Sequence, residues 1–173
     1  MITDEILDFY FYCQLKAKNR LNNVKFTNFP YHDIHKKLKQ ESQKLFNPLS
    51  IKNTLLKNYQ LQKLSFTFIY PYIEIDNLKH TPIFFSNHLT ITKEDKEKYS
   101  FKSILLTERF IVTHYKVIRY NGLISKFKVN NTDTTYKSII NNLAQKVNIT
   151  KISHCNICEY RDYCYNKLRE KDD

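Results

Sequence analysis

The sequence predicts one domain of the α/β or α+β class, in which helices and a sheet pack in layers. Segments with apolar residues at helical spacing open and close the chain, and segments rich in Phe, Tyr and Ile stand between them. The single glycine follows an asparagine between two strand-like segments, which is a strong hairpin signal. With 173 residues, 42% of them hydrophobic, the chain is long enough to bury one core.

The first predicted helix begins after Thr3, whose side chain is a suitable N-cap. Asp4 and Glu5 then place negative charge in the first turn, where the helix dipole favours it. Apolar residues follow at helical spacing: Ile6, Phe9, Tyr10 and Cys13. Cys13 is therefore expected on the buried stripe near the end of this helix.

A helical, basic part is predicted to extend over residues 1–63. The basic segment Gln14–Arg20 and a loop that contains Pro30 follow the first helix. Two further helices are predicted, over residues 33–45 and 50–63.

Residues 64–147 are predicted to form the α/β core. Asn121 and Gly122 should form the hairpin turn between its last two strands, with the glycine at positive φ. The acidic residues after Thr92 mark the start of a helix. The predicted elements are, in order, two strands, a helix, two strands and a helix, over residues 65–76, 81–86, 92–109, 110–120, 123–129 and 132–147.

The composition excludes several classes of protein. One glycine in the whole chain rules out glycine-rich phosphate loops and dinucleotide fingerprints. No apolar run is long enough to span a membrane, and the first eight residues are acidic where a signal peptide would be basic. We therefore expect a soluble, cytoplasmic protein that has no membrane partner.

The formal net charge of +11 is concentrated in the first half of the chain. Between Cys13 and Ile69 there are eleven Lys or Arg against two acids, a net of +9. Such a basic half suits a polyanion, because bound phosphates release counterions. The alternative is that a lysine-rich composition merely solvates helix faces. The candidate nucleic-acid-binding residues are Lys16, Lys18, Arg20, Lys36, Lys37 and Lys39.

Three of the four cysteines lie in the closing segment, residues 148–173. Cys155, Cys158 and Cys164 have C-x2-C-x5-C spacing, and Cys13 lies near the other end of the chain. Four thiolates match the ligand set of an iron–sulfur cluster or a structural zinc ion, and spacing alone does not decide between them. The alternatives are buried core cysteines or disulfides. If Cys13 is the fourth ligand, the metal site joins the two ends of the domain.

Both ends of the chain resemble the RecB-like nucleases that carry an iron–sulfur cluster, a family that includes the CRISPR-associated exonucleases and the nuclease domain of AddB. The segment H-C-N-I-C-E-Y-R-D-Y-C, residues 154–164, is similar to their closing segment nearly residue for residue. The segment D-E-I-L-D-F-Y-F-Y-C-Q-L-K-A-K, residues 4–18, is similar to their first helix. The branch that looks closest consists of uncharacterised RecB-like nucleases whose cysteine segment continues into further domains.

The resemblance implies a fold, cofactors and partners. The fold is the restriction-endonuclease-like PD-(D/E)XK core, a mixed sheet flanked by helices, with the terminal segments joined by a metal cluster. The cofactors are a [4Fe–4S] cluster and, at the nuclease site, Mg²⁺ or Mn²⁺. The partners are DNA, single-stranded or at its ends, and a helicase or another DNA-processing protein. The implied cluster ligands are Cys13, Cys155, Cys158 and Cys164.

The nuclease motif itself matches in part. The family places an acid at the end of one strand and acid-x-Lys on the next. Glu74 and Asp76 are the candidate catalytic acids at the end of the first strand. The next strand, Pro82–Ser86, has no acid followed two residues later by lysine, and Phe84 and Phe85 stand where an acid and its lysine are expected. Glu94, Asp95 and Lys96 are expected to be a solvated helix start.

The sequence leaves two functions open. The first is an iron–sulfur-containing protein of the RecB-like nuclease family that binds DNA and has a degenerate or weak metal-dependent nuclease site. The alternative is a non-catalytic nucleic-acid-binding module, stabilised by zinc or by an iron–sulfur cluster, that is a fragment of a longer helicase or nuclease chain.

Overall fold

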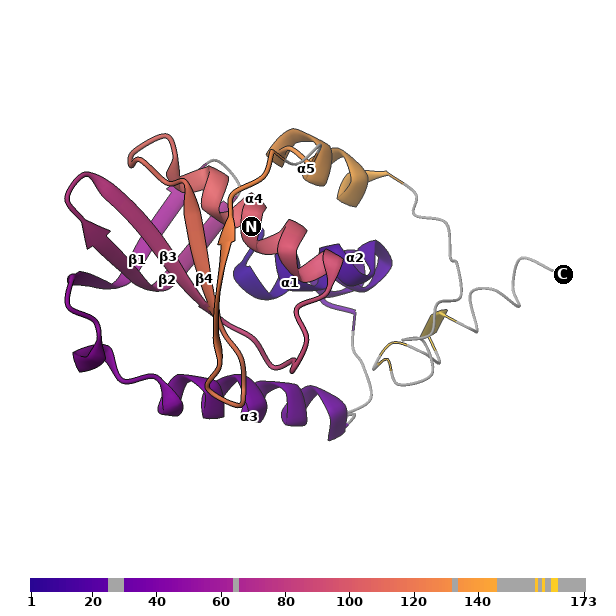
Figure 1. Cartoon of the computed structure of the whole chain (residues 1–173). Coiled ribbons are helices and arrows are strands. Elements are labelled where there is room, and N and C mark those ends of the chain that lie inside the picture. Colours follow the sequence, from indigo (N-terminus) through magenta and orange to yellow (C-terminus); the bar gives the residue numbers. More distant parts are fainter. Residues whose placement is uncertain are drawn as a thin grey trace, which may run out of the picture.

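The computed structural model describes residues 1–24, 30–63, 66–131 and 134–145, and also Cys158, Tyr160, Tyr163 and Cys164. Within residues 30–36 it describes the backbone only. A mixed sheet stands on one side of the molecule, with helices around it (Figure 1).

The sheet has five strands in the order β1-β2-β3-β4-β5. The first three strands form an antiparallel meander, α4 then crosses over to β4, which is parallel to β3, and β5 returns antiparallel. The crossover makes the sheet mixed, and it leaves β1 and β5 as the two edge strands. The strands are β1 Thr54–Lys63, β2 Phe66–Asp76, β3 Lys79–Phe85, β4 His114–Ile118 and β5 Ile124–Lys128.

Side-chain caps define the starts of several helices. Thr3 accepts a hydrogen bond from the backbone of Ile6, and Thr92 and Thr135 each form a reciprocal capping box. The helices are α1 Asp4–Tyr12, α2 Gln14–Leu21, α3 Pro30–Leu45, α4 Lys93–Leu106 and α5 Tyr136–Ala144, with a short 3₁₀ turn η1 at Pro48–Ser50.

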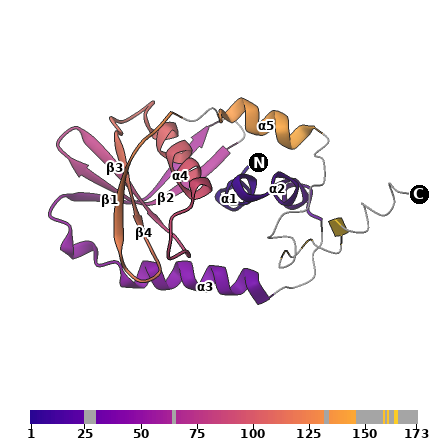
Figure 2. The same ribbon diagram turned by 45° about the vertical axis from the view of Figure 1, so that its right-hand side comes forward.

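The helices cover the two faces of the sheet unequally. A large core of aromatic and aliphatic side chains lies between the sheet and α1, α4 and α5. A smaller cluster on the opposite face joins the end of α3 to the sheet through Phe46, Ile83, Phe85 and Ile118. In both views α3 runs along one side of the molecule, away from α5, while α1 and α2 lie next to each other (Figure 2).

The structure confirms most of the predicted elements and corrects one. The segment 50–63, predicted as a helix, is η1 followed by β1. Apolar residues in this segment are compatible with helical spacing, but pairing decides the outcome, since β1 aligns with β2 from Thr54 opposite Ile75 to Lys63 opposite Phe66. The boundary predicted at residue 63, between the helical part and the α/β core, therefore falls inside the β1–β2 hairpin. The basic segment 14–20 forms the helix α2.

The hairpin turn predicted at Asn121 and Gly122 is confirmed. Gly122 has φ +80° in the β4–β5 turn, where its N–H bonds to the carbonyl of Arg119 at 2.9 Å. Asn77 has φ +53° in the tight β2–β3 turn.

None of the helices in the described part of the chain has the length and apolar character needed to span a bilayer.

Candidate functional site

Cys13 occupies the junction between α1 and α2. Its backbone N–H closes α1 on the carbonyl of Phe9 at 2.7 Å, and its side chain caps α2 by accepting from the N–H of Lys16 at 3.5 Å. The thiol is half-buried at the helix junction, one residue beyond the end of the helix on whose buried stripe it was predicted.

Cys158 and Cys164 each form a hydrogen bond with the backbone of the buried Tyr160. The N–H of Tyr160 donates to the sulfur of Cys158 at 3.5 Å, and the N–H of Cys164 donates to the carbonyl of Tyr160 at 2.9 Å. The side-chain amide of Asn19 on α2 donates to the sulfur of Cys164 at 3.9 Å. Cys13 is the N-cap of α2, and Asn19 belongs to the same helix. The contact with Asn19 therefore places Cys164 next to the helix that Cys13 caps.

The sulfur surroundings suit thiolate ligands. Each of the three described cysteines accepts an N–H hydrogen bond, and such bonds stabilise thiolates in metal clusters. Cys155 lies outside the described residues. Among the residues that are described, no group of three or more His, Cys, Asp or Glu side chains is arranged to hold a metal ion. The four-cysteine cluster therefore stays a prediction.

Glu74 and Asp76 lie on the same face of β2 but have different environments. Glu74 is buried, and its carboxylate accepts from Lys116 on β4 and, at 2.8 Å, from the side chain of Asn53. Burial raises the pKa of Glu74, but the hydrogen bonds from Lys116 and Asn53 outweigh it and hold the pKa below its ordinary value. Asp76 is exposed at the β2–β3 turn and accepts from Asn77 at 3.3 Å.

Aromatic rings occupy the positions on β3 where the nuclease motif was expected. Phe84 stacks on Tyr99 of α4 with ring centroids 4.8 Å apart, inside the main core. Phe85 points to the opposite face and packs against Phe46, with centroids 5.7 Å apart. Both faces of β3 are therefore filled with rings at this point, and neither ring can bind a metal ion or orient water.

The predicted basic residues lie on two helices, and most of them contact their own chain. On α2, the ammonium of Lys16 lies 4.1 Å from the centre of the Phe9 ring, Lys18 donates to the carbonyl of Gln145, and Arg20 pairs with Glu5 at 3.2 Å. These contacts anchor α2 to its neighbours.

On α3, Lys39 pairs with Asp8 of α1 at 3.6 Å, and Lys37 is exposed. The side chain of Lys36 lies outside the described residues. The six residues thus do not form one row of side chains that all point to solvent.

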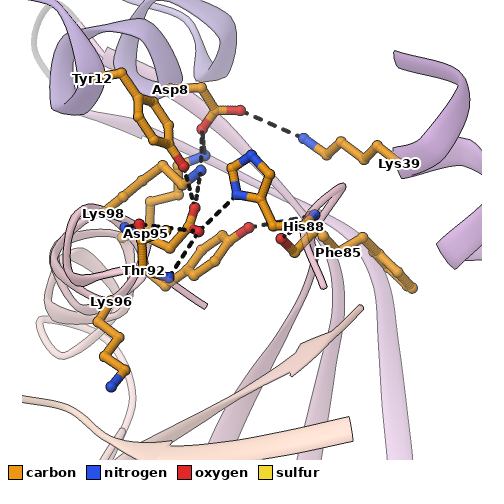
Figure 3. A network of polar contacts seen from close by, with 12 residues as sticks. Asp8, Tyr12, Lys39, Phe85, His88, Thr92, Asp95, Lys96 and Lys98 are labelled. Atoms are coloured by element: carbon orange, nitrogen blue, oxygen red, sulfur yellow. Dashed lines mark hydrogen bonds and ion pairs between the residues drawn. The ribbon is translucent and has the colours of Figure 1, made fainter. Parts of the chain in front are cut away.

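A buried charge network that the sequence did not suggest connects α1 with α4 (Figure 3). Lys102 of α4 pairs with Asp4 at 2.9 Å and with Asp8 at 3.0 Å, and Lys98 lies 3.8 Å from Asp8 and 3.3 Å from Asp95. Both lysines are almost completely buried. In the sequence, charged residues four positions apart on a helix indicate a solvated face. Here the acidic pair on α1, Asp4 and Asp8, faces the basic pair on α4, Lys98 and Lys102, where the two helices pack together.

Asp95 is the centre of the second half of the network. It is 1% exposed, which corrects the expectation of a solvated helix start, although its neighbours Glu94 and Lys96 are exposed. Its carboxylate accepts from the hydroxyl of Tyr12 and from Nδ1 of His88 at 2.9 Å, and it closes the capping box with Thr92. A carboxylate has no proton to give, so Nδ1 of His88 carries the hydrogen.

The lysines determine the charge state of these carboxyl groups. Burial raises the pKa of Asp8, but the charges of Lys102, Lys98 and Lys39 outweigh it and hold the pKa far below the ordinary 3.8. Burial likewise raises the pKa of Asp95, but hydrogen bonding from His88 and the charge of Lys98 hold that pKa far below its ordinary value. Both groups are therefore ionised and already neutralised by protein cations, so the network connects helices and offers no open metal ligand.

No protein-family model matches the sequence, and no curated protein matches it. The residues and their geometry therefore carry the functional argument.

We predict that Lys102→Met destabilises the fold by about 3 kcal/mol, because it leaves two partly buried carboxylates without their shared cation. The loss should lie at the low end for a broken buried pair, since Asp8 keeps Lys98 and Lys39. Urea denaturation measures the change. The matched control is Lys93→Met at the exposed start of the same helix, which should change stability by less than about 0.5 kcal/mol. Equal effects would contradict the role of the network.

Stability should depend steeply on pH in the acidic range. The folded pKa values of Asp8 and Asp95 lie below their unfolded values, so their contribution is complete above about pH 4 and is lost as the pH falls below it. Urea midpoints measured from pH 7 to pH 3 should fall in the wild type. Asp8→Asn/Asp95→Asn should be less stable at pH 7 and should show a shallower fall. Parallel curves would mean that other groups control acid unfolding.

Proposed function

We propose that this chain is a DNA-binding protein of the RecB-like nuclease family, with an iron–sulfur cluster that joins its two ends and a nuclease site that has lost its chemistry. The observation that carries the proposal is the set of hydrogen bonds that the described cysteine sulfurs accept. Each described sulfur accepts an N–H bond, and Asn19 links Cys164 to the helix that begins at Cys13.

The order of elements supports the same family. The resemblance implies an acid-bearing strand, a second strand and then a helix, and β2, β3 and α4 follow in this order within a mixed sheet. Glu74 and Asp76 lie on β2, as the motif would require of its first acid. The finer assignment to the PD-(D/E)XK fold is part of the proposal.

The cluster would be held by Cys13, Cys155, Cys158 and Cys164. When bound, it would supply a covalent connection between the terminal segments, so that folding and metal binding depend on each other. The chain's own contribution is to position α2: the α1–α4 network fixes α1, and Cys13 follows directly at its end.

Binding without cleavage follows from the carboxylates. Metal-assisted hydrolysis needs ligands that fix the ion and a group that orients the attacking water. Glu74 is already bound to Lys116 and Asn53, Asp76 is exposed, and β3 offers phenyl rings. This arrangement favours a protein that holds DNA and does not cut it.

We expect anaerobically purified protein to be brown and to contain about four iron atoms per chain, because four thiolates complete one cubane cluster. Cys13→Ala and Cys158→Ala should both lose iron and unfold at lower urea concentrations. Thr3→Ala is the control, since it removes a helix cap worth about 1 kcal/mol but no thiolate, and it should keep its iron. Stoichiometric zinc in iron-replete cells, or full iron content in Cys13→Ala, would overturn the assignment.

We expect no appreciable cleavage of single-stranded DNA in Mg²⁺ or Mn²⁺, although the protein binds it. The comparison is wild type beside Glu74→Ala/Asp76→Ala in an assay with end-labelled DNA. Both proteins should leave the DNA intact. Robust wild-type cleavage that disappears in the double variant would show that these carboxylates do hold a catalytic ion.

A further inference from the structure

The face of the sheet opposite the main core is partly open. Tyr115 and Val117 of β4 point into the main core, so His114, Lys116 and Ile118 point to the other side. There Ile118 packs with Phe46 at the end of α3, which covers one end of this face. The other end holds His114 and the exposed side chains around it.

The open end carries a concentration of positive charge. His114 stands directly opposite Lys128 of the edge strand β5, and Lys116 stands opposite Lys126. Lys79 of β3 points the same way as Ile83, which pairs with Lys116. We call the five residues the lysine face: Lys79, His114, Lys116, Lys126 and Lys128.

The charges of the lysine face act on one another. Slight burial and then the charges of Lys126, Lys128 and Lys79 lower the pKa of His114. The acids next to the lysine face are Glu74, which binds Lys116, and Asp76, which stands opposite Lys79 in the β2–β3 register. Lys126 and Lys128 are exposed on the edge strand, so this part of the surface retains its positive charge.

A cavity of about 400 Å³ adjoins the lysine face at the end that α3 covers. Its apolar wall is formed by Phe46, Ile83 and Ile118, and Glu74 and Lys116 form the polar wall. The exposed Ile124 and Lys52 also line it. This volume lies within the range of small-ligand sites, and an apolar wall with a few polar groups is their usual construction.

We propose that the lysine face binds single-stranded nucleic acid, with phosphates along Lys126 and Lys128 and one base in the cavity beside Glu74. The inference rests on the nucleic-acid binding proposed above, but it does not depend on the iron–sulfur cluster. It also moves the binding surface from α2 and α3 to β4 and β5.

The combination of charge and cavity selects a single strand. Lysines alone would bind any polyanion, but a base enters a cavity only when it is unstacked and unpaired. Each carboxylate oxygen of Glu74 on the cavity wall already accepts one hydrogen bond, from Asn53 or from Lys116, and has a second lone pair that can accept another. A carboxylate accepts from the exocyclic amine of cytosine. The site should therefore prefer a base with an amino group.

The first experiment measures phosphate contacts by fluorescence anisotropy with a twelve-nucleotide oligodeoxycytidylate. Lys126→Ala/Lys128→Ala should reduce the slope of log K against log salt by about 1.4, because each phosphate contact with a single strand contributes about 0.7. The matched control is Lys93→Ala/Lys137→Ala, which removes two exposed lysines from α4 and α5, helices on the opposite face. Equal losses in the two variants would overturn the lysine face, since net charge alone would then explain binding.

The second experiment tests the cavity. Wild type should bind oligodeoxycytidylate roughly twofold to tenfold more tightly than oligodeoxyuridylate, in which a carbonyl oxygen replaces the 4-amino group and N3 carries a hydrogen, because the exocyclic carbonyl cannot donate the one net hydrogen bond to Glu74. Ile124→Trp, which narrows the cavity with a larger side chain, should remove this preference and keep the wild-type salt slope. An unchanged preference in Ile124→Trp, or none in wild type, would overturn the placement of the base.

The pKa of His114 gives an independent readout by NMR. Bound phosphates compensate the neighbouring lysines, so the oligonucleotide should raise this pKa towards its ordinary value. An unshifted His114 in protein saturated with oligonucleotide would place the nucleic acid elsewhere. Failure of wild type to bind any oligonucleotide would overturn both this inference and the DNA-binding part of the proposed function, while its iron content would still test the cluster separately.

Discussion

The ion pairs between α1 and α4 hold in place the helix that ends at Cys13, from which the candidate cysteine site is built. Lys98 and Lys102 project from α4 into the space below α1 and meet Asp4 and Asp8 there. Buried lysines and carboxylates tolerate only a geometry in which each charge keeps a partner, because desolvation is otherwise not compensated. Hydrophobic packing brings α1 onto the sheet, and the charge network restricts its rotation and translation there.

The position of Cys13 follows from this constraint. Cys13 ends α1 and caps α2, so a fixed α1 gives a fixed start to α2, and Asn19 on α2 then meets Cys164. Cys164 therefore contacts a helix that the core has already positioned. The proposed cluster would connect Cys13 with a cysteine that already contacts α2. This contact supports Cys13 as a ligand, although it is far from the other cysteines in the sequence.

The two faces of the sheet divide the remaining roles. One face is packed with aromatic rings from β2, β3 and α4, including Phe84, and Phe85 packs on the opposite face. These two rings occupy the positions where a nuclease would carry its acid and its lysine. The other face is closed by the end of α3 on one side and presents lysines on the other. The proposed polyanion-binding surface therefore lies on one face of the sheet, and among the residues described the sheet contributes no open pair of metal-binding carboxylates.

Local signals in the sequence determined the capped helices that begin after Thr3 and Thr92, the hairpin at Gly122 and the strand that ends at Asp76. Caps and positive-φ turns depend on residues a few positions apart, so a single sequence contains them. Tertiary structure alone decided that residues 54–63 form a strand, because the partner strand supplies its hydrogen bonds. It also decided that Lys98, Lys102 and Asp95 are buried and that His114, Lys126 and Lys128 share one surface. Charged side chains prefer water in every sequence. Only the contacts between elements that are distant in the sequence show which charged side chains gain a partner and can be buried.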